Sequence, residues 1–384
     1  MKAFITPKVL EWARKSANIS DDEAAHKAGV DTDTLLSWEK GEELPSITHI
    51  RKLGAAYKRP IAVFYLPEPP TDFQPLKDYR RMPGKIYRGL SAELNFEIRS
   101  AHDRRSLLID LYEDMGEEPP KFSGRASMDD DPEKLAQKIR GMIGVSLQKQ
   151  AIRDPNACFN YWRSALDELG IIVFQIADVA ETEARGFSIS EAVLPVIAAN
   201  RKDNPRSRVF TMMHELVHLM LKGGGLCDLD DKDGRRPEEQ KVEVFCNHVA
   251  GAILVPENDL LNKPVVIAKG KDKIWADQEI EALAKVYGIN REVILRRLLI
   301  FSRTTKEFYE QKRGQYQKEY ATRPKKTKPG FLPPALDAVS SLGRPYVHIV
   351  LDAFHQEKIT AGGVSDYLGV QVKHLSRIEE LVSS

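Results

Sequence analysis

The feature that most constrains this chain is the pentapeptide His214-Glu215-Leu216-Val217-His218, which lies in a helix predicted from about Arg206 to Leu221. Residues four positions apart lie above one another on the same face of a helix, so the two imidazoles can reach one metal ion. Most flanking residues are apolar, which predicts a buried helix. Burying its polar side chains costs free energy unless they are paired or bind a ligand. The alternative is a histidine pair that packs on the helix without a metal.

The residue after the first histidine, Glu215, is the candidate general base, because its carboxylate can take a proton from a metal-bound water. A catalytic zinc needs a third protein ligand, which we expect from the next helix, predicted from about Pro237 to Leu254. Glu243 is favoured because the residues around it in that helix are mostly apolar. The remaining candidates are Glu238, Glu239, Glu257 and the Asp228–Asp233 cluster.

The rest of the chain predicts an α+β multidomain protein that is mostly helical. Three strand-like runs precede the motif, at Ile171–Ile176, Gly186–Ile189 and Leu194–Ala199, and they predict a small β-sheet. We expect a helical unit at 1–66, a Pro-rich linker at 67–90, a central domain with a helical lead-in at 91–301, a basic linker helix at 302–330 and a small helical C-terminal module at 331–384.

The unit at 1–66 has the signals of a helix-turn-helix fold. Ser20 and Glu23 form a capping-box pattern, and Gly29 is placed to end that helix. The second helix of the motif, 31–40, then offers candidate DNA contacts at Thr32, Thr34, Ser37 and Lys40. Its three acidic residues against one lysine give −2, which predicts weak phosphate binding unless a homodimer doubles the contacts. The alternative is a protein-docking role without DNA.

Charge and composition exclude several classes of protein. The 384 residues contain 57 Lys+Arg and 56 Asp+Glu, so a basic site must be local. Residues 303–330 are such a place, with nine Lys/Arg against three Asp/Glu (net +6) and interspersed tyrosines that can stack on single-stranded nucleic acid. A solvated linker helix is the alternative. Three cysteines, no long apolar run and no signal-peptide pattern predict a cytoplasmic protein without a membrane partner.

The sequence around the histidines strongly resembles the ImmA/IrrE family of bacterial metallo-endopeptidases. The resemblance is carried by Phe210–Leu221, by Glu243–Ala250, which matches the family's E-x-x-A-N-x-F-A segment, and by Ile253–Pro256. It covers about residues 150–300, and residues 1–66 resemble the XRE family of helix-turn-helix proteins. The resemblance implies a zincin-like catalytic domain in which His214, His218 and Glu243 bind Zn²⁺ and Glu215 is the general base.

The sequence also departs from the family pattern. Val217 stands where the family usually has glycine, which bears on the width of the substrate cleft more than on zinc binding. Cys246 replaces an alanine, and its thiolate is an alternative ligand. His248 or a tyrosine is a candidate donor to the oxyanion, with a structural role as the alternative for His248. The Leu194–Ala199 run is either a core strand or a strand beside the cleft to which an extended peptide adds.

These observations lead to two hypotheses of different classes. The first is a zinc metallo-endopeptidase, gluzincin-like and in a latent or active state, which regulates a stress, phage or mobile-element response by cleaving a transcriptional repressor. The second is a DNA-binding transcriptional regulator or antitoxin, paired with a cognate toxin, that uses the metallopeptidase fold as a binding module. A third hypothesis, weaker than both, is self-cleavage in the Pro-rich linker.

Overall fold

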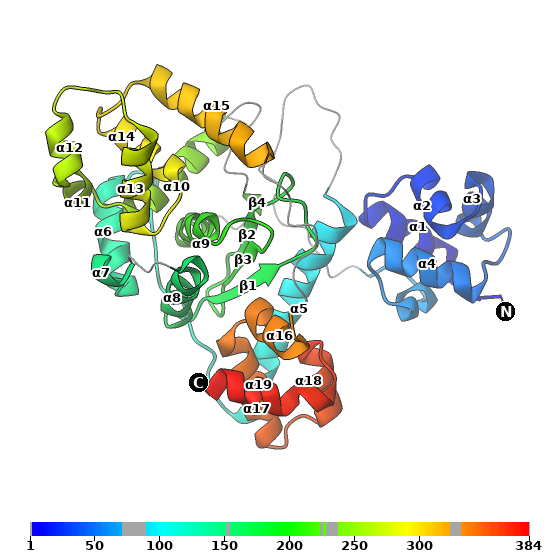
Figure 1. Ribbon diagram of the computed structural model, residues 1–384. Helices are drawn as coiled ribbons and strands as arrows, with labels where there is room; N and C mark the ends of the chain where they lie inside the picture. The colour runs from blue at the N-terminus through cyan, green and yellow to red at the C-terminus, as the bar shows by residue number, and fades with distance from the viewer. Residues whose placement is uncertain are drawn as a thin grey trace. The chain divides into compact units, whose positions relative to one another are not determined.

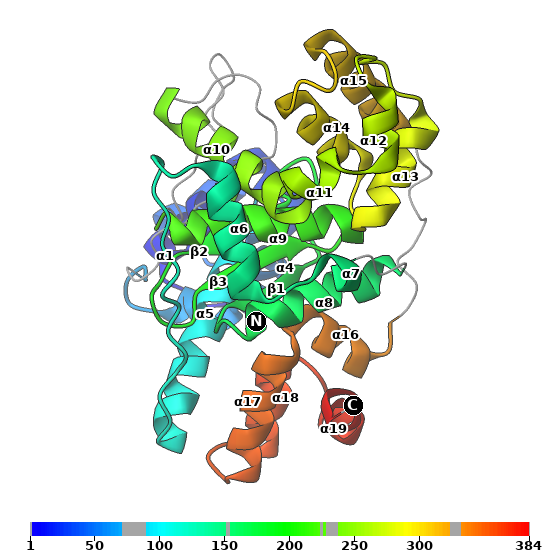
Figure 2. The ribbon, with the colours of Figure 1, turned by 90° about the vertical axis from the view of Figure 1, so that its left-hand side faces the viewer.

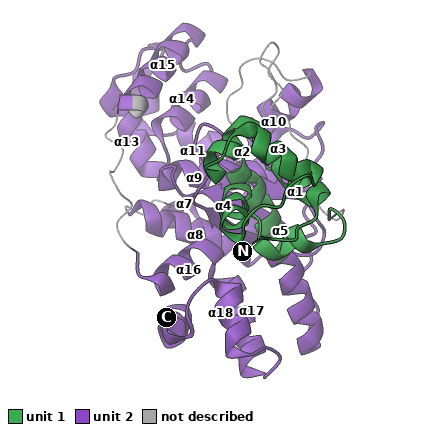
Figure 3. Cartoon of the chain, turned by 90° about the vertical axis from the view of Figure 1, so that its right-hand side faces the viewer, with its two compact units in different colours: residues 1–76, 82–103 green, residues 77–81, 104–384 purple. Residues whose placement is uncertain are grey.

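The computed structural model describes residues 2–70, 90–150, 154–222, 226–227, 237–322 and 332–383. The chain divides into two compact units, one of residues 1–76 and 82–103 and the other of residues 77–81 and 104–384 (Figure 3). Most of the linker predicted at 67–90 lies outside the described residues. Within the described part, no helix is long and apolar enough to span a membrane.

The first unit is a bundle of short helices, as the sequence predicts. Its elements are α1 (Pro7–Ser16), α2 (Asp21–Ala28), α3 (Thr32–Lys40), α4 (Ile47–Tyr57), the 3₁₀ turn η1 (Ile61–Tyr65) and the start of α5 (Ala92–Met115). The Ser20 hydroxyl accepts a hydrogen bond from the backbone amide of Glu23, which starts α2. Gly29 and Gly41 end α2 and α3 with φ of +81° and +79°. These local signals confirm the predicted helix-turn-helix.

The second unit contains the remaining helices and one small sheet (Figure 1). The helices before the basic segment are α6 (Pro132–Ile143), α7 (Leu147–Gln150), α8 (Pro155–Asp167), α9 (Pro205–Met220), α10 (Pro237–Leu254), α11 (Glu257–Leu261), α12 (Pro264–Lys269), α13 (Asp277–Tyr287) and α14 (Arg291–Ile300). They are followed by α15 (Lys306–Thr322), α16 (Pro334–Leu342), α17 (Arg344–His355), α18 (Ala361–Leu368), the 3₁₀ turn η2 (Val372–His374) and α19 (Leu375–Ser383). The strands are β1 (Ile172–Ile176), β2 (Gly186–Ile189), β3 (Val196–Asn200) and β4 (Leu226–Cys227).

The sheet has the order β1-β3-β2-β4, in which β3 pairs parallel with β1 and antiparallel with β2. Ile197, for example, is in register with Val173 on one side and with Ser188 on the other. A strand that is paired along both edges has no free backbone groups to offer a peptide. The hypothesis that Leu194–Ala199 accepts an extended substrate is therefore wrong, and the run is a core strand.

Helix α9 lies at the centre of the second unit (Figures 1 and 2). It packs on β2 and β3, while α8 and α10 contact it on other sides and α6 packs against α10. Every residue from Ser207 to Met220 is buried, as expected for a helix that is apolar on most of its surface. The helix starts at Asn204, whose side chain accepts from the amide of Arg206, and Pro205 suits its first turn. The histidine motif is thus fixed in the core.

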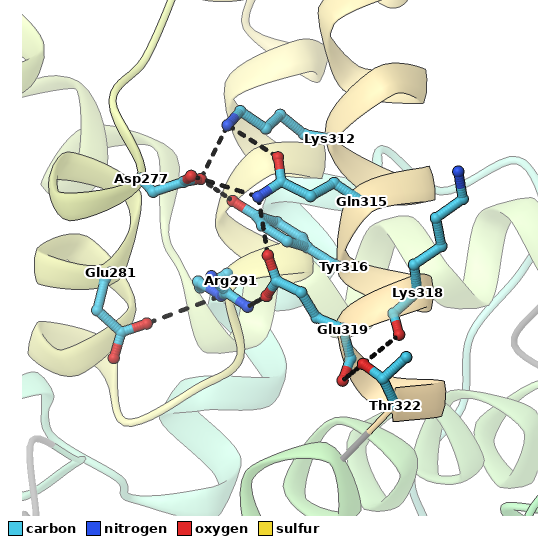
Figure 4. A network of polar contacts seen from close by, with 9 residues as sticks. All are labelled: Asp277, Glu281, Arg291, Lys312, Gln315, Tyr316, Lys318, Glu319 and Thr322. Carbon is cyan, nitrogen blue, oxygen red and sulfur yellow. Dashed lines mark hydrogen bonds and ion pairs between the residues drawn. The ribbon is translucent and has the colours of Figure 1, made fainter.

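Helix α15 packs against α14 and is not a solvated linker (Figure 4). Tyr316 is 8% exposed, and the guanidinium of Arg291 lies 4.0 Å from the centre of its ring. Arg291 also pairs with Glu319 at 2.6 Å, and Lys312 pairs with Asp277 at 3.0 Å. A buried ring cannot stack on bases, so Tyr316 does not support single-stranded nucleic acid binding at 303–330, which stays a prediction. Residues 323–330 lie outside the described residues.

The C-terminal helices are joined to the edge of the sheet. The side-chain amide of Gln175, on β1, donates to the backbone carbonyl of Ser340 at 2.7 Å. The guanidinium of Arg163, on α8, donates to the same carbonyl at 2.6 Å. Helix α16 therefore covers the β1 side of the sheet, and α17–α19 extend from it.

Candidate metal centre

Two neighbouring helices bring three candidate ligands together. His214 and His218 project from α9, and Glu243 projects from α10. The Nε2 atoms of the two histidines are 2.9 Å apart, and each lies 3.4 Å from one oxygen of Glu243. All three side chains are buried, with the most exposed residue, His218, at 4%. Among the described residues, this is the one group of His, Cys, Asp and Glu whose ligand atoms converge closely enough to hold a metal ion.

The geometry of this group fits a metal of zinc's size. Zinc binds imidazole nitrogen and carboxylate oxygen at about 2.0–2.2 Å, so ligand atoms in a tetrahedral site lie roughly 3.3–3.5 Å apart. The observed separations of 2.9–3.4 Å are close to that value. The Nδ1 atom of His214 lies 3.0 Å from Oδ1 of Asn247, an acceptor that would keep the proton on Nδ1 when Nε2 binds a metal.

The electrostatics of the group favour a cation. Burial opposes ionisation of Glu243, but hydrogen bonds from His214 and His218 hold its pKa well below the usual range. Burial also opposes protonation of His218, but its interactions with Cys246 and Glu243 hold its pKa well above the usual value. The metal-free cluster therefore carries a proton that a metal must displace, so metal binding is expected to weaken as the pH falls.

The candidate base, Glu215, is fully buried beside the cluster. Its Oε2 atom accepts a hydrogen bond of 2.7 Å from the hydroxyl of Ser188, on β2, while Oε1 is buried without a hydrogen-bond partner among the described residues. Burial raises the pKa of Glu215 above its ordinary value, which makes the carboxylate a stronger base. Sequence reasoning missed Ser188, because only the pairing of β2 with β3 shows that this serine faces α9.

The structure places the other candidates elsewhere. The Nε2 atom of His248 lies 2.9 Å from Glu133, on α6, which supports a structural role for this ring, while its role as an oxyanion donor stays a prediction. Cys246 hydrogen-bonds with His218 but is outside the three-residue group. The carboxylates Glu238, Glu239 and Glu257 are also outside that group, and Asp228–Asp233 lie outside the described residues.

In the first unit, the hydroxyls predicted to contact DNA donate to neighbouring protein groups. Thr32 donates to Asp22 at 2.7 Å, Thr34 to Asp31 at 2.9 Å and Ser37 to the carbonyl of Thr34 at 2.8 Å. These hydroxyls can still accept hydrogen bonds from base edges, and Lys40 is exposed at the end of α3. Their role in reading DNA stays a prediction.

The ligand set leads to a direct test. Glu243→Gln is expected to lower metal affinity by more than about 100-fold. Loss of a residue that hydrogen-bonds to a metal ligand already costs up to about 100-fold, and loss of the ligand itself costs at least as much. Metal content after dialysis and competition with a chelating dye would measure the change. Glu238→Gln, in the first turn of the same helix, is the matched control and should retain metal. Equal metal content in both variants would contradict the assignment of Glu243.

Comparison with known families agrees with the arrangement of these sites. Residues 167–299, which include all four residues of the metal centre, match the peptidase M78 family, described as IrrE N-terminal-like domain. Residues 10–64 match the family described as Helix-turn-helix. No curated protein is found to match the chain. The chain thus joins an amino-terminal helix-turn-helix domain to an IrrE N-terminal-like domain of the M78 peptidase type.

Proposed function

We propose that this protein is a zinc-dependent endopeptidase that regulates a stress, phage or mobile-element response by cleaving a transcriptional repressor. The observation that carries the proposal is the free Oε1 atom of Glu215, buried next to three converging metal ligands. A buried carboxylate oxygen without a hydrogen-bond donor is costly for the fold unless it serves a function. The helix-turn-helix match supports a regulatory setting near DNA.

Each of the chain's own residues has a defined task in this proposal. His214, His218 and Glu243 would hold the zinc, which when bound polarises a peptide carbonyl and lowers the pKa of a bound water to about 7. Glu215 receives the proton of the attacking water on Oε1 and later donates it to the leaving nitrogen. Ser188 holds the other oxygen of Glu215, so that Oε1 keeps its direction during both transfers.

The burial of the centre favours a latent enzyme. His214, Glu215 and Glu243 are at most 1% exposed, so a peptide carbonyl reaches them only after neighbouring residues move apart. We therefore expect little cleavage of generic peptides, and we expect the signal that starts the response, or the repressor itself, to open the site.

A cellular experiment tests the function and identifies the substrate. New protein N-termini would be mapped in cells carrying the wild type or Glu215→Gln, with and without DNA damage. The proposal predicts a new terminus on a regulatory protein that appears only with the wild type. Identical termini in both strains, with zinc bound to both proteins, would reject the peptidase and favour the regulator or antitoxin hypothesis.

Ser188→Ala is expected to reduce kcat on the identified substrate by about 10- to 150-fold, the range for losing a hydrogen bond to a charged group of about 1.5–3 kcal/mol. KM should change little, because the serine contacts the base and not the substrate. Its hydrogen bond lowers the pKa of Glu215, so the variant should raise that pKa and move the acid limb of the kcat/KM profile to higher pH. Ser190→Ala is the control, since the hydroxyl of Ser190 donates to the backbone carbonyl of Leu219 and, among the described residues, has no hydrogen bond to Glu215. An unshifted pH profile would assign Ser188 a purely structural role.

A further inference from the structure

The C-terminal helix α18 resembles α2 in its cap, length and closing glycine, and it is followed by the 3₁₀ turn η2 and α19 at the place where α3 follows α2. The hydroxyl of Thr360 accepts from the amide of Gly363 at 3.2 Å, as the hydroxyl of Ser20 accepts from Glu23 at 3.2 Å. Each cap is followed by a helix of eight residues, Ala361–Leu368 and Asp21–Ala28. Each helix then ends at a glycine with positive φ, +65° at Gly369 and +81° at Gly29, which is followed by valine.

The pattern of burial repeats as well. Counted from the caps, corresponding positions are buried in both motifs, in the pairs Ala24 and Val364, Ala28 and Leu368, and Trp38 and Ile378. The first two pairs lie on the first helix of each motif, and the third lies on the second helix. The second helices thus share one buried position, at Trp38 and Ile378, whereas Leu35 is fully buried and the corresponding Leu375 is half-buried. Residues 10–64 match the helix-turn-helix family, and the shared cap, helix length and buried positions are the basis for comparing residues 360–383 with that fold.

The second helices of the two motifs differ in charge. Residues 31–40 contain Asp31, Asp33 and Glu39 against Lys40, which gives −2. The corresponding residues 371–380 contain Lys373 and Arg377 against Glu379 and Glu380, which gives 0, and both cations precede the two acids. Lys373 and Arg377 are exposed. The Arg377 ion pair with Glu380 is itself on the surface, with both side chains more than 60% exposed, and such pairs are weak enough to exchange for a phosphate.

Two helices joined at a glycine turn do not by themselves form a DNA-binding surface, as α13 and α14 show. Gly288 ends α13 with a φ of +66°, but Ile294, Leu295 and Leu298 of α14 are fully buried. Helix α14 packs between α10 and α15, so it cannot enter a groove of DNA. The segment from η2 to the first turn of α19 differs, since Gln371, Lys373 and Arg377 are exposed and Val372 is 50% exposed.

We propose that residues 360–383 are a second helix-turn-helix that binds duplex DNA, with the segment from Gln371 to Arg377 in the major groove and Lys373 and Arg377 on phosphates. The phosphate contacts that the acidic α3 cannot supply would come from this module. A protein carrying two such motifs can hold DNA through both, which raises the effective concentration of the second once the first is bound. The inference concerns DNA binding and does not depend on the peptidase activity.

The test compares full-length variants for binding to a labelled mixed-sequence duplex at several salt concentrations. Two fewer phosphate contacts reduce the slope of log K against log salt by about 1.8. The loss of affinity between about 50 and 200 mM salt should then be about 12-fold smaller for Lys373→Ala/Arg377→Ala than for the wild type. Circular dichroism would establish that each variant is folded.

The control removes the same amount of positive charge from the C-terminal helical region, outside residues 360–383. Arg344→Ala/Lys358→Ala changes two exposed residues outside the α18–α19 motif and should keep the wild-type slope. Equal slopes for all three proteins would overturn the proposal and favour a protein-docking role for α19. If both variants lowered the salt slope equally, the effect would come from net charge and not from the motif, which would also overturn the proposal. A wild-type chain that binds no duplex at low salt would overturn it as well.

Discussion

Replacing Glu215 with glutamine is expected to slow cleavage by about 10²- to 10⁴-fold, the usual contribution of a general base. Glutamine has the same shape, and its amide oxygen can still accept the hydrogen bond that Ser188 donates to Glu215. It cannot take up the proton of the attacking water. Single-turnover cleavage of the substrate found by N-terminal mapping would measure the rate, and metal analysis would show that the ion is retained.

The same substitution gives a second readout that is independent of activity. Burial raises the folded-state pKa of Glu215, so the metal-free fold loses stability as the pH rises above the unfolded-state pKa, and the loss is complete above the folded-state pKa. Glu215→Gln removes that charge and is expected to melt at the same temperature as the metal-free wild type at neutral pH, or higher. A variant that cleaves within tenfold of the wild-type rate would exclude Glu215 as the base.

Replacing Glu133 with glutamine is expected to destabilise the second unit by about 3–5 kcal/mol, the usual cost of an uncompensated buried charge. The guanidinium of Arg297, on α14, is fully buried and donates to both oxygens of Glu133 at 2.6 and 2.7 Å. His248, on α10, contacts the same carboxylate. The three residues therefore join α6, α10 and α14 around one charge, and glutamine leaves the Arg297 cation unpaired.

The effect of Glu133 should also depend on pH in a defined direction. Burial opposes its ionisation, but Arg297 and His248 lower its pKa to about 2. Its ionised form therefore stabilises the fold above the ordinary carboxyl pKa, and this contribution is lost as the pH falls through the interval from about 4.5 to 2. Chemical denaturation of wild type and variant across that interval would measure it.

The control is an ion pair of the same type on the surface. Glu118 and Lys121 are 3.2 Å apart, with side chains that are 88% and 65% exposed. Glu118→Gln should cost no more than about 1 kcal/mol at any pH. If Glu133→Gln and Glu118→Gln lowered the free energy of unfolding equally, the inferred stabilisation by the buried network would be wrong.

The sequence by itself determined the features that depend on neighbours in the chain. The spacing of His214 and His218 is set by the helical repeat, and Glu243 stood out because the residues around it are apolar. The caps and glycines of the first unit likewise act within a few residues, so Ser20, Gly29 and Gly41 could be assigned before the fold was known. The two matching families agree with this part of the prediction.

Only the tertiary structure decided which residues meet across long separations. Ser188 reaches Glu215 through the register of β2, and His248 faces Glu133 because α6 packs on α10. Tyr316 of α15 is covered by Arg291, although its sequence has the composition of a surface helix. Local patterns specify the faces of helices and strands, but the partner of each face follows from packing the whole core, where burial and pairing of charges are decided together.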